Sequence, residues 1–485
     1  MKRIYYILLL LTTLVSCNDW LDVSPRSESK EKDLYSTEDG FKASLIGVYI
    51  NMAQSSLYGE NTTIYLPEVL SHHWTLPVET STQMYQTANF DYTASNVESL
   101  LNTIWSNYYT SIAQLNNLLA NIDEANVNFT NGNKNLIKGE ALGLRAFLHF
   151  DLLRYFGPIP NNADQSVNAI PYVTEMTKES DKLNSIPYGQ VIAKIEKDLN
   201  DAEEFLKNDP IINNTNAALN KTNGTGENYP KDSWQLFRQN RFNYYAVLAI
   251  KARFYHWIGN KEAALHYAKL VIGAQNLDLT SKFKLADEST YTSASDLVMF
   301  SENIIGLHNP EHQTVIESLF KGKNATLSQS VTFLNVAYET NVNANDIRYK
   351  ENRYWKEETY DNSVKVNHFL KYTGNTSISS INTIPLIRLS ELYFILIEDT
   401  EDVKERFEYF QTYRIARNLS MSLDDEMNNS AIVIQRLEKE YRKEFFGEGQ
   451  MFFFYKKHEY EQYGWPSPFT LPSLAAYVVT KPKNS

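Results

Sequence analysis

Apolar residues recur at helical spacing in several long stretches of the 485-residue chain. Positions i, i+3, i+4 and i+7 share one face of a helix, so this spacing indicates amphipathic helices. It predicts helices over residues 38–52, 97–123, 134–155 and 186–207, and two helices joined at Gly259-Asn260 within residues 243–274. The same spacing predicts a last helical block from Ile387 to about Lys457.

Two stretches interrupt this periodicity. Residues 71–96 ("SHHWTLPVETSTQMYQTANFDYTASN") are rich in Thr, Ser, Asn and aromatic residues and are predicted to form a long loop. Residues 275 to about 380 lack long helical periodicity, and short alternating segments such as "NIIGLHN" predict strands there. Long loops in compact domains tend to be functional. The pattern therefore predicts a mainly α fold with helix pairs at both ends and a loop-rich middle.

The N-terminus has the features of an export signal. Lys2 and Arg3 precede an apolar run from Ile4 to Val15, which is shorter than the roughly 20 residues of a membrane-spanning helix. Ser16 and Cys17 follow, and Leu14-Val15-Ser16-Cys17 resembles the bacterial lipobox, in which the cysteine carries lipid. This predicts a signal peptide over residues 1–16, lipidation of Cys17 and a tether over residues 17–35. An ordinary signal peptide with an incidental cysteine is the alternative.

Composition narrows the function classes. A net charge of −12 argues against nucleic acid, because phosphates require clustered Lys and Arg. Cys17 is the only cysteine, so no disulfide forms within the chain. No later apolar run is long enough for a membrane span, which leaves the lipid as the expected membrane attachment.

Motifs for catalysis or metal binding are weak. His72 and His73 lack the companions of a zinc motif, and no phosphate-binding or acyl-transfer motif stands out. The carboxylate pair of a glycosidase cannot be recognised without distances in space. Charged residues at helical spacing are expected to have structural roles. Asp151 is expected to pair with Arg154 and Glu438 with Arg442, and Arg388 and Glu391 are expected to pair with each other or with backbone groups. No catalytic residue, metal or cofactor is predicted.

Several segments, taken in order, resemble the SusD/RagB family of outer-membrane lipoproteins of Bacteroidetes. They include "CNDWLDVSP", "IWSNYYTSIAQLNNLL", "EALGLRAFLHFDLLRYFGPIP", "YYAVLAIKARFYHWIGNKEAALHYAKLVI", "IPLIRLSELYFILIE" and "EKEYRKEFFGEGQMFFF". The resemblance implies tetratricopeptide-like helix pairs that form a right-handed scaffold under a loop-rich, ligand-binding face. It implies an N-terminal helical region over residues 36–274 and a C-terminal region, loop-rich and then helical, over residues 275–485.

The resemblance also implies a function. Such proteins are non-enzymatic receptors on the cell surface, anchored in the outer membrane by lipid. They capture oligosaccharides, and sometimes peptides, and deliver them to a TonB-dependent transporter of the SusC kind. A peptide- or protein-binding surface lipoprotein of the same lid type is the main alternative, and a surface glycoside hydrolase is a further one.

The C-terminal helix departs from the family pattern. Glu440, Arg442, Glu444, Glu448 and Gly449 match it, whereas other positions differ, namely Tyr441, Gly447, Met451 and Phe454. We therefore expect apolar packing to replace the salt-bridge network that the pattern would support, as in a divergent branch of the family.

Ligand contacts are predicted on physical grounds, since the family's ligand loops vary. Sugars stack on exposed aromatic rings and bond to polar side chains in loops. The predicted ligand residues are two pairs of aromatics with two hydrogen-bonding neighbours: Trp74, Tyr85, Asn89, Arg353, Tyr354 and Trp355. Each aromatic has two alternatives: burial in the core, since large rings are highly buried on average, or a place at the transporter interface.

Overall fold

The computed structural model describes residues 31–77, 79–161, 163–176, 183–294, 296–349, 353–373, 382–419, 427–463 and 473–482. The predicted signal peptide, Cys17 and most of the predicted tether lie outside the described residues.

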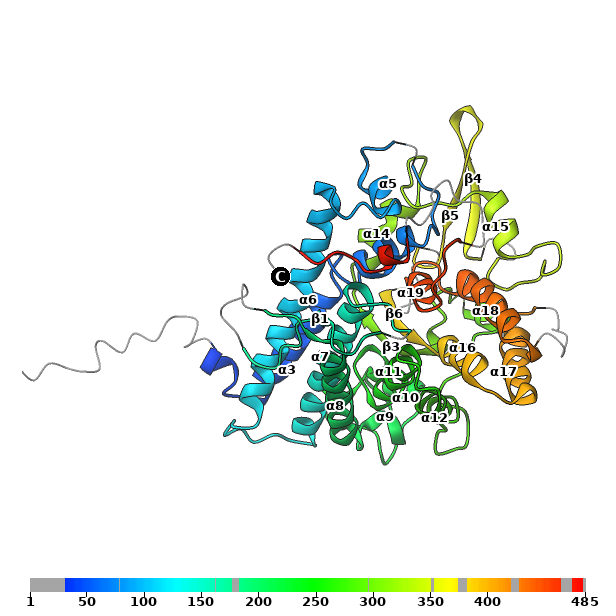
Figure 1. Cartoon of the computed structure of the whole chain (residues 1–485). Coiled ribbons are helices and arrows are strands. Elements are labelled where there is room, and N and C mark those ends of the chain that lie inside the picture. The colour runs from blue at the N-terminus through cyan, green and yellow to red at the C-terminus, as the bar shows by residue number, and fades with distance from the viewer. Residues whose placement is uncertain are drawn as a thin grey trace, which may run out of the picture.

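Long helices form the N-terminal half, as predicted (Figure 1). They are α3 (Glu38–Met52), α6 (Ser95–Ile122), α7 (Asn133–Phe156), α8 (Tyr188–Leu206), α11 (Tyr244–Trp257) and α12 (Lys261–Ile272). The turn between α11 and α12 contains Gly259, whose φ of +78° glycine tolerates without steric cost. Asn260 then caps α12, because its side chain accepts a hydrogen bond from the backbone N–H of Ala263.

Neighbouring helices pack in pairs. Helix α7 packs along α8, α11 along α12, and α3 along α6. Helix α7 is buried along almost its whole length, so it is the central helix of this half. The mainly α fold with paired helices is confirmed.

The C-terminal helical block continues the same packing. It contains α16 (Leu389–Asp399), α17 (Val403–Ala416), α18 (Ser430–Glu444) and α19 (Gln450–Lys457). Helix α12 packs against α16, so the paired helices run from one half of the chain into the other. The predicted start at Ile387 was early, since this residue lies in strand β6 (Thr383–Arg388).

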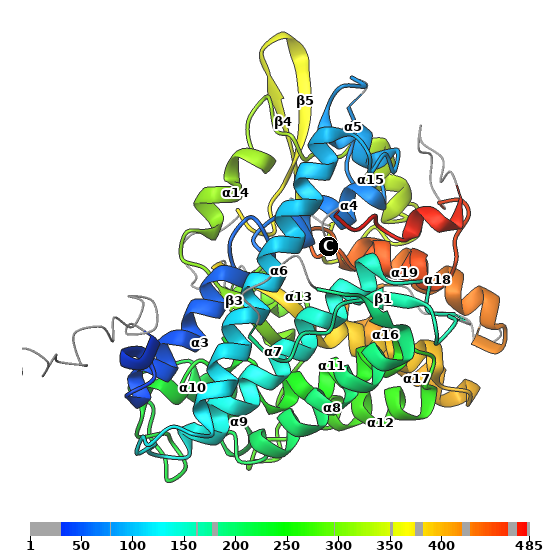
Figure 2. The same cartoon turned by 60° about the vertical axis from the view of Figure 1, so that its left-hand side comes forward.

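Strands occur as antiparallel pairs. β1 (Asn168–Ile170) pairs with β2 (Ile186–Pro187), and β3 (Asn303–His308), the strand predicted from "NIIGLHN", pairs with β6. β4 (Trp355–Tyr360) and β5 (Val364–Phe369) form a hairpin, in register from Trp355 opposite Phe369 to Tyr360 opposite Val364. Figures 1 and 2 both show this hairpin projecting from one end of the molecule.

Short helices occupy the stretches predicted as loops. The long loop over residues 71–96 contains α5 (Gln83–Ala88), capped by Thr82. The remaining short helices are η3 (Asn61–Tyr65), α4 (Leu66–Leu70), α9 (Pro210–Asn213), α10 (Asn216–Leu219), η5 (Ser233–Gln235), η6 (Arg238–Asn240), α13 (Glu288–Ala294), η7 (Phe300–Glu302), α14 (His312–Phe320), α15 (Val331–Ala337), η9 (Asp361–Ser363) and η12 (Leu474–Tyr477).

Buried apolar residues form two clusters. The larger one lies within the paired helices and reaches from Tyr35 to Val479. The smaller one, here called the loop-face core, joins residues 64–88 to residues between 286 and 446. Both clusters draw residues from either side of position 274, so the boundary predicted between residues 274 and 275 does not separate two cores; the division of the chain there stays a prediction.

The expected loss of a C-terminal salt-bridge network was wrong. The buried carboxylate of Glu444 accepts hydrogen bonds from Arg388 Nη1 at 2.7 Å, Arg417 Nη2 at 2.7 Å and Arg348 Nη1 at 3.0 Å. Burial raises the pKa of Glu444, but Arg417 and Arg388 outweigh this effect and hold the pKa well below its usual value. Tyr441 and Phe454 do pack against each other, with ring centroids 4.7 Å apart, so apolar packing adds to the network rather than replacing it.

The predicted helical charge pairs had mixed outcomes. Arg154 pairs with Asp151 at 3.0 Å and Arg442 with Glu438 at 2.7 Å, as predicted. Glu391 instead accepts from Arg253 Nε at 2.5 Å, while Arg388 turns to the Glu444 network. The predicted pairing of Arg388 with Glu391 was wrong, because spacing along one segment cannot reveal a better partner from a distant helix. The backbone alternative does occur, since Arg388 Nη2 donates to the carbonyl of Glu444 at 3.0 Å.

Candidate functional site

Three of the predicted ligand residues are buried. Trp74, Tyr354 and Trp355 have 1%, 0% and 4% of their surface exposed and belong to the loop-face core. The indole N–H of Trp74 donates to the carbonyl of Ile64 at 3.0 Å, so its polar atom is satisfied inside the protein. A ring must be exposed to stack on a ligand, and these three rings are not. They are core residues, which was the alternative to ligand binding.

These three rings meet around Phe369 on strand β5. The ring centroids of Trp74, Tyr354 and Trp355 lie 5.5, 6.0 and 4.9 Å from that of Phe369. Trp355 is also the first residue of β4 and lies opposite Phe369 in the hairpin. The sequence thus identified residues that do come together in space, but they hold the base of the hairpin in the loop-face core.

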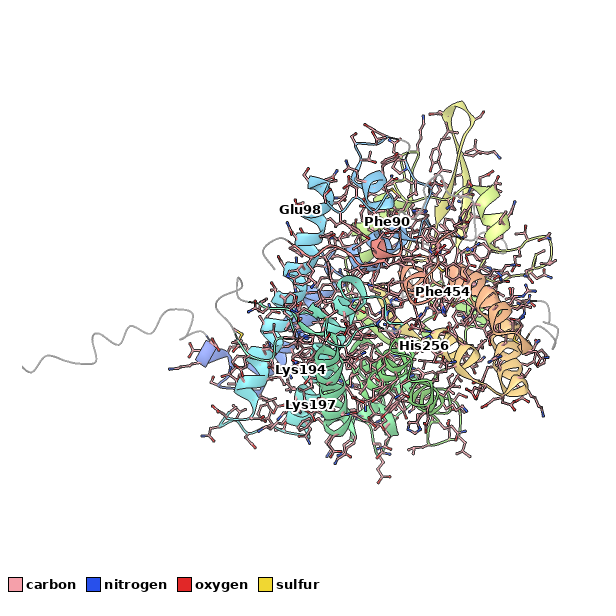
Figure 3. The ribbon with its side chains drawn as sticks, in the orientation of Figure 1. Phe90, Glu98, Lys194, Lys197, His256 and Phe454 are labelled. Carbon is pink, nitrogen blue, oxygen red and sulfur yellow. The ribbon has the colours of Figure 1, made fainter. Side chains whose placement is uncertain are left out.

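The other three predicted residues lie at the edge of this core and are partly exposed. Tyr85 is on α5 and packs against the loop-face core. Asn89 follows this helix and donates through Nδ2 to the carbonyl of Tyr85 at 2.9 Å. Arg353 donates to Glu288 at 2.7 Å, with its guanidinium 5.0 Å from the ring centroid of Tyr291. Phe90, next to Asn89, is labelled beside α5 in Figure 3.

Tyr349 is a further candidate that the sequence reasoning missed. Its half-buried ring stacks on the buried ring of Tyr338, with centroids 4.7 Å apart and planes within 10°. Its hydroxyl donates to Asn335 on α15 at 3.2 Å. Burial and the nearby carboxylate of Glu357 raise the pKa of Tyr349. This residue stands in the same segment as Tyr354 and Trp355, but no signal in the sequence distinguishes the exposed ring from the buried ones.

Gln329 forms hydrogen bonds with three segments that surround the loop-face core. Its side-chain oxygen accepts from the hydroxyl of Thr75 at 3.0 Å, and its amide nitrogen donates to the carbonyl of His73 at 2.9 Å. Its own carbonyl accepts from Asn367 on β5 at 2.9 Å. The loop after α4, the segment before α15 and the hairpin are therefore held together. The surface that these segments form with residues 83–89, 338–349 and 353–354, around the loop-face core, is here called the loop face.

The adjacent histidines take part in the same packing. His73 bonds through Nδ1 to Glu68 at 2.7 Å, and its ring stacks on Phe446 with centroids 4.6 Å apart. His72 bonds through Nε2 to the carbonyl of Ala88 at 2.9 Å, and burial lowers its pKa to about 4. Each ring thus has a structural partner in the loop face.

Comparison with known proteins shows a sequence likeness over part of the chain and a shared fold over most of it. Residues 19–221 match the sequence profile of a family described as "Starch-binding associating with outer membrane", of the SusD-like kind. A curated relative, SusD-like protein P2 of Formosa agariphila, is 26% identical over 204 residues, which are 42% of this chain and 38% of that protein. The match therefore spans less than half of the relative's length.

Solved structures extend the likeness to the rest of the chain. A SusD superfamily protein of Bacteroides thetaiotaomicron VPI-5482 superposes with a TM-score of 0.68 at 20% identity, over 91% of this chain and 93% of that one. The chain therefore has a SusD-like fold, and residues 19–221 carry the sequence likeness to the family. A second structure, titled as a putative sugar binding protein from Bacteroides vulgatus ATCC 8482, has a TM-score of 0.65 at 20% identity and covers 86% of each chain. At these identities the structures show a shared SusD-like fold.

One group of side chains in this SusD-like protein has the composition of a metal site. Ligand atoms of His256, Glu398 and Asp399 lie within 4.8 Å of one another. However, Lys457 and His458 also pair with Glu398, and His256 bonds to Asp399 at 2.6 Å. Burial lowers the pKa of His256, but Asp399 and Glu398 outweigh it and raise the pKa to about 9. Glu398 and Asp399 are thus engaged by basic side chains, and these residues form an ion-pair cluster.

Within the described ranges of this SusD-like chain, no helix is both long enough and apolar enough to cross a membrane.

Proposed function

We propose that this protein is a cell-surface receptor, anchored in the outer membrane through lipid on Cys17, that binds oligosaccharides without turning them over. We further propose that it delivers them to a TonB-dependent transporter of the SusC kind. The observation that carries the proposal is the SusD-like fold over nine-tenths of the chain, together with a matched family described as starch-binding and associated with the outer membrane.

The loop face is the proposed place of ligand contact. Tyr85 and Tyr349 present partly exposed rings there, and the ring of Tyr349 is held in a fixed orientation by its stacking on Tyr338. Rigid rings of this kind suit stacking against the apolar faces of sugars. Asn89 and Arg353 supply amide and guanidinium groups near the same core. Trp74, Tyr354 and Trp355 support the surface from beneath.

Alanine variants of the two exposed tyrosines test this site. Losing one stacking ring removes about 1.5–3 kcal/mol of apolar burial, so Tyr85→Ala and Tyr349→Ala should each weaken oligosaccharide binding roughly tenfold or more. Binding is measured by titration calorimetry with a hit from a glycan array. Tyr85→Phe and Tyr349→Phe keep the rings and serve as matched controls that should bind normally.

Three results would contradict the proposal. Unchanged affinity in both alanine variants, with folding intact by circular dichroism, would reject the loop face as the ligand site. Hydrolysis products in chromatograms of the glycan incubated with the protein would show an enzyme instead. A glycan array without hits, combined with a bound peptide, would favour the peptide receptor.

A further inference from the structure

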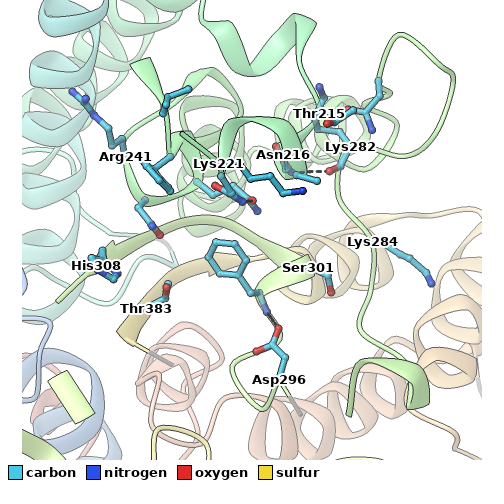
Figure 4. A pocket seen from close by; sticks show the side chains of 18 of the residues that line it. Thr215, Asn216, Lys221, Arg241, Lys282, Lys284, Asp296, Ser301, His308 and Thr383 are labelled. Atoms are coloured by element: carbon cyan, nitrogen blue, oxygen red, sulfur yellow. Dashed lines mark hydrogen bonds between the residues drawn. The ribbon is translucent and has the colours of Figure 1, made fainter. Parts of the chain in front are cut away.

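A cavity of about 1240 Å³ is the second feature of the molecule that could hold a ligand (Figure 4). Its walls come from helix α3, the segment from residue 215 to 241, the loop from 276 to 284, and the β3–β6 pair with the residues before it. None of its lining residues belongs to the loop-face core or to the predicted ligand set. Its volume exceeds the roughly 300–1,000 Å³ of pockets that hold drug-sized ligands, so it has room for more than one sugar ring.

Phe237 in the wall of this cavity has an unusual backbone conformation. Its φ of +54° and ψ of 41° lie in the left-handed region, which is sterically unfavourable for a phenylalanine, yet 40% of its surface is exposed. Its neighbours enforce the conformation. The N–H of Phe237 donates to the carbonyl of Leu219 at 2.9 Å, and the next residue, Arg238, is fully buried between Asp209 and Glu140. A strained backbone that holds an aromatic ring toward solvent is typical of a binding site.

A second aromatic ring stiffens the wall. The guanidinium of Arg241 lies 3.5 Å from the ring centroid of Trp234 and donates to the carbonyl of the same residue at 2.6 Å. Arg241 is itself fixed by an ion pair with Glu140 at 3.1 Å. The indole N–H of Trp234 is buried and makes no hydrogen bond within the described part of the chain. This N–H group is therefore available to donate a hydrogen bond in the wall of the cavity.

Three asparagine side chains in the lining have an amide oxygen with no hydrogen-bond donor among the described residues. The side-chain oxygens of Asn216, Asn240 and Asn276 accept no hydrogen bond from any described residue. For Asn216 and Asn276 the amide nitrogen is already committed, to the carbonyl of Lys282 at 2.8 Å (dashed in Figure 4) and to the hydroxyl of Thr280 at 2.9 Å. Buried polar groups normally have partners, so these oxygens point to a ligand or bound water that supplies O–H or N–H donors.

Most charged groups of the lining already have hydrogen-bond or ion-pair partners within the protein. Asp296 accepts from the backbone N–H of Phe300 at 2.8 Å, and Lys284 pairs with Asp287 at 2.9 Å. Lys282 donates to three backbone carbonyls, including Asn214 at 2.7 Å, and burial lowers its pKa to about 8. Lys221 is exposed, and basic side chains outnumber acidic ones in the lining. These N–H donors and the amide groups beside them can bond to the hydroxyl oxygens of a sugar.

From this combination we infer that the cavity is a second carbohydrate-binding site, which takes a segment of an oligosaccharide with Phe237 as its stacking ring. This inference rests on the proposed function, because it assumes the same class of ligand. The strained, exposed ring supplies the apolar platform, and the unpartnered amide oxygens and indole N–H supply hydrogen bonds to hydroxyl groups.

Two glycine variants of the full-length, detergent-solubilised protein test the inference. Phe237→Gly removes the ring and also relieves the left-handed backbone. Leu279→Gly is the matched control, because Leu279 also has a positive φ, of +65°, is 76% exposed and does not line the cavity. A purely structural role for Phe237 predicts a lower Tm for its variant. A binding role predicts lost binding with a Tm that does not fall, because glycine tolerates the left-handed backbone.

Binding is read with a glycan array of neutral gluco-, manno-, galacto- and xylo-oligosaccharides, followed by titration calorimetry of a hit. We expect two sites per chain in the unmodified protein and in Leu279→Gly, one site in Phe237→Gly, and two in Phe237→Tyr. The remaining site of Phe237→Gly should disappear when Tyr85→Ala and Tyr349→Ala are added.

The outcomes separate this inference from the proposed function. Unchanged stoichiometry and affinity in Phe237→Gly would overturn the second site and leave the receptor function standing. A loss of peptide binding, but not of glycan binding, in Phe237→Gly would also overturn it. No bound glycan in the unmodified protein would reject the proposed function and this inference with it.

Discussion

Buried charges around Glu444 show how single residues hold distant parts of this chain together. Its carboxylate joins Arg348, which precedes the hairpin, to Arg388 at the end of β6 and to Arg417 after α17. All four side chains are fully buried. Charges without water are stable only when every partner is present, so each member of the network depends on the others.

Glu444→Gln should therefore be severely destabilising. It leaves three buried guanidinium groups without their shared carboxylate, and breaking a buried pair in this way costs about 3–5 kcal/mol of the free energy of unfolding. Denaturant unfolding followed by circular dichroism measures the change. Glu357→Gln is the control, because Glu357 pairs with Lys365 on the exposed hairpin and surface pairs contribute little. Equal stability of the two variants would contradict this account.

The sequence located the important aromatics without revealing which were exposed. Trp74 and Trp355 stand in segments without periodicity, so no face pattern separates core from surface, and size alone favours neither role. The same limit applies to Arg388, whose partner on α18 is 56 residues away. Contacts between segments far apart in the chain decide both cases, and a single sequence does not record them.

The sequence predicted the long helices more accurately than any other part of the structure. The predicted range of 38–52 agrees with α3, and those of α6 and α7 agree within two residues, because a long apolar stripe and its flanking caps define a helix locally. Residues 275–380 were harder to predict. Their helices are short, such as α15, and their positions are set by packing on the loop-face core rather than by their own pattern.

Glycines inside two helices give a matched test of packing. A Cβ at Gly143 on α7 would lie 2.3 Å from the ring of Phe242, whereas a Cβ at Gly47 on α3 would meet no atom within 4 Å. Gly143→Ala should lower the free energy of unfolding by about 1–3 kcal/mol through overpacking. Gly47→Ala should raise it by about 0.5–1 kcal/mol, since alanine is the better helix former.

Chemical denaturation of both alanine variants measures these effects. A stabilised Gly143→Ala would mean that Phe242 moves aside without cost, and the close approach of this ring to α7 would then have no structural role.

The His256 cluster should make helix packing sensitive to pH. His256 on α11 forms a hydrogen bond with Asp399 at the end of α16. Glu398, the residue before Asp399, pairs with Lys457 at the end of α19. The pKa of His256 is raised from 6.5 to about 9 in the folded protein. Its stabilising contribution is thus complete below pH 6.5 and is lost as the pH rises through 9, and it amounts to on the order of 3 kcal/mol.

The difference in free energy of unfolding between the unmodified protein and His256→Gln measures this contribution. It should shrink between pH 6.5 and pH 9, whereas other titrating groups, such as Lys282, affect both proteins alike. A difference that stays constant over this range would mean that His256 does not titrate there.

At the scale of the whole molecule, two cores share one scaffold. The paired helices enclose the larger core, and the loop-face core is built on one end of it, below the hairpin seen in Figure 2. We expect lipid on Cys17 to attach the protein to the membrane without contributing to either core, so attachment and folding should be independent of each other.

Cys17→Ala should therefore leave the Tm and oligosaccharide binding unchanged while moving the protein from the membrane fraction to the soluble fraction. Cell fractionation and labelling with a fatty-acid analogue measure this change. Ser16→Ala keeps a small residue before the cysteine and should remain in the membrane fraction. A Cys17→Ala variant that stays membrane-bound with normal processing would contradict the lipoprotein proposal.

The loop-face core can form only after most of the chain has been synthesised, because its residues are far apart in the sequence. Trp74 emerges early in synthesis, but two of its ring partners, Phe369 and Phe446, follow about 300 and 370 residues later. Until then the aromatic residues of this face have no core to enter, and such surface is prone to aggregation. A chain that stops before residue 446 can form helix pairs but has no finished loop face, so the proposed receptor surface is among the last parts of the molecule to exist.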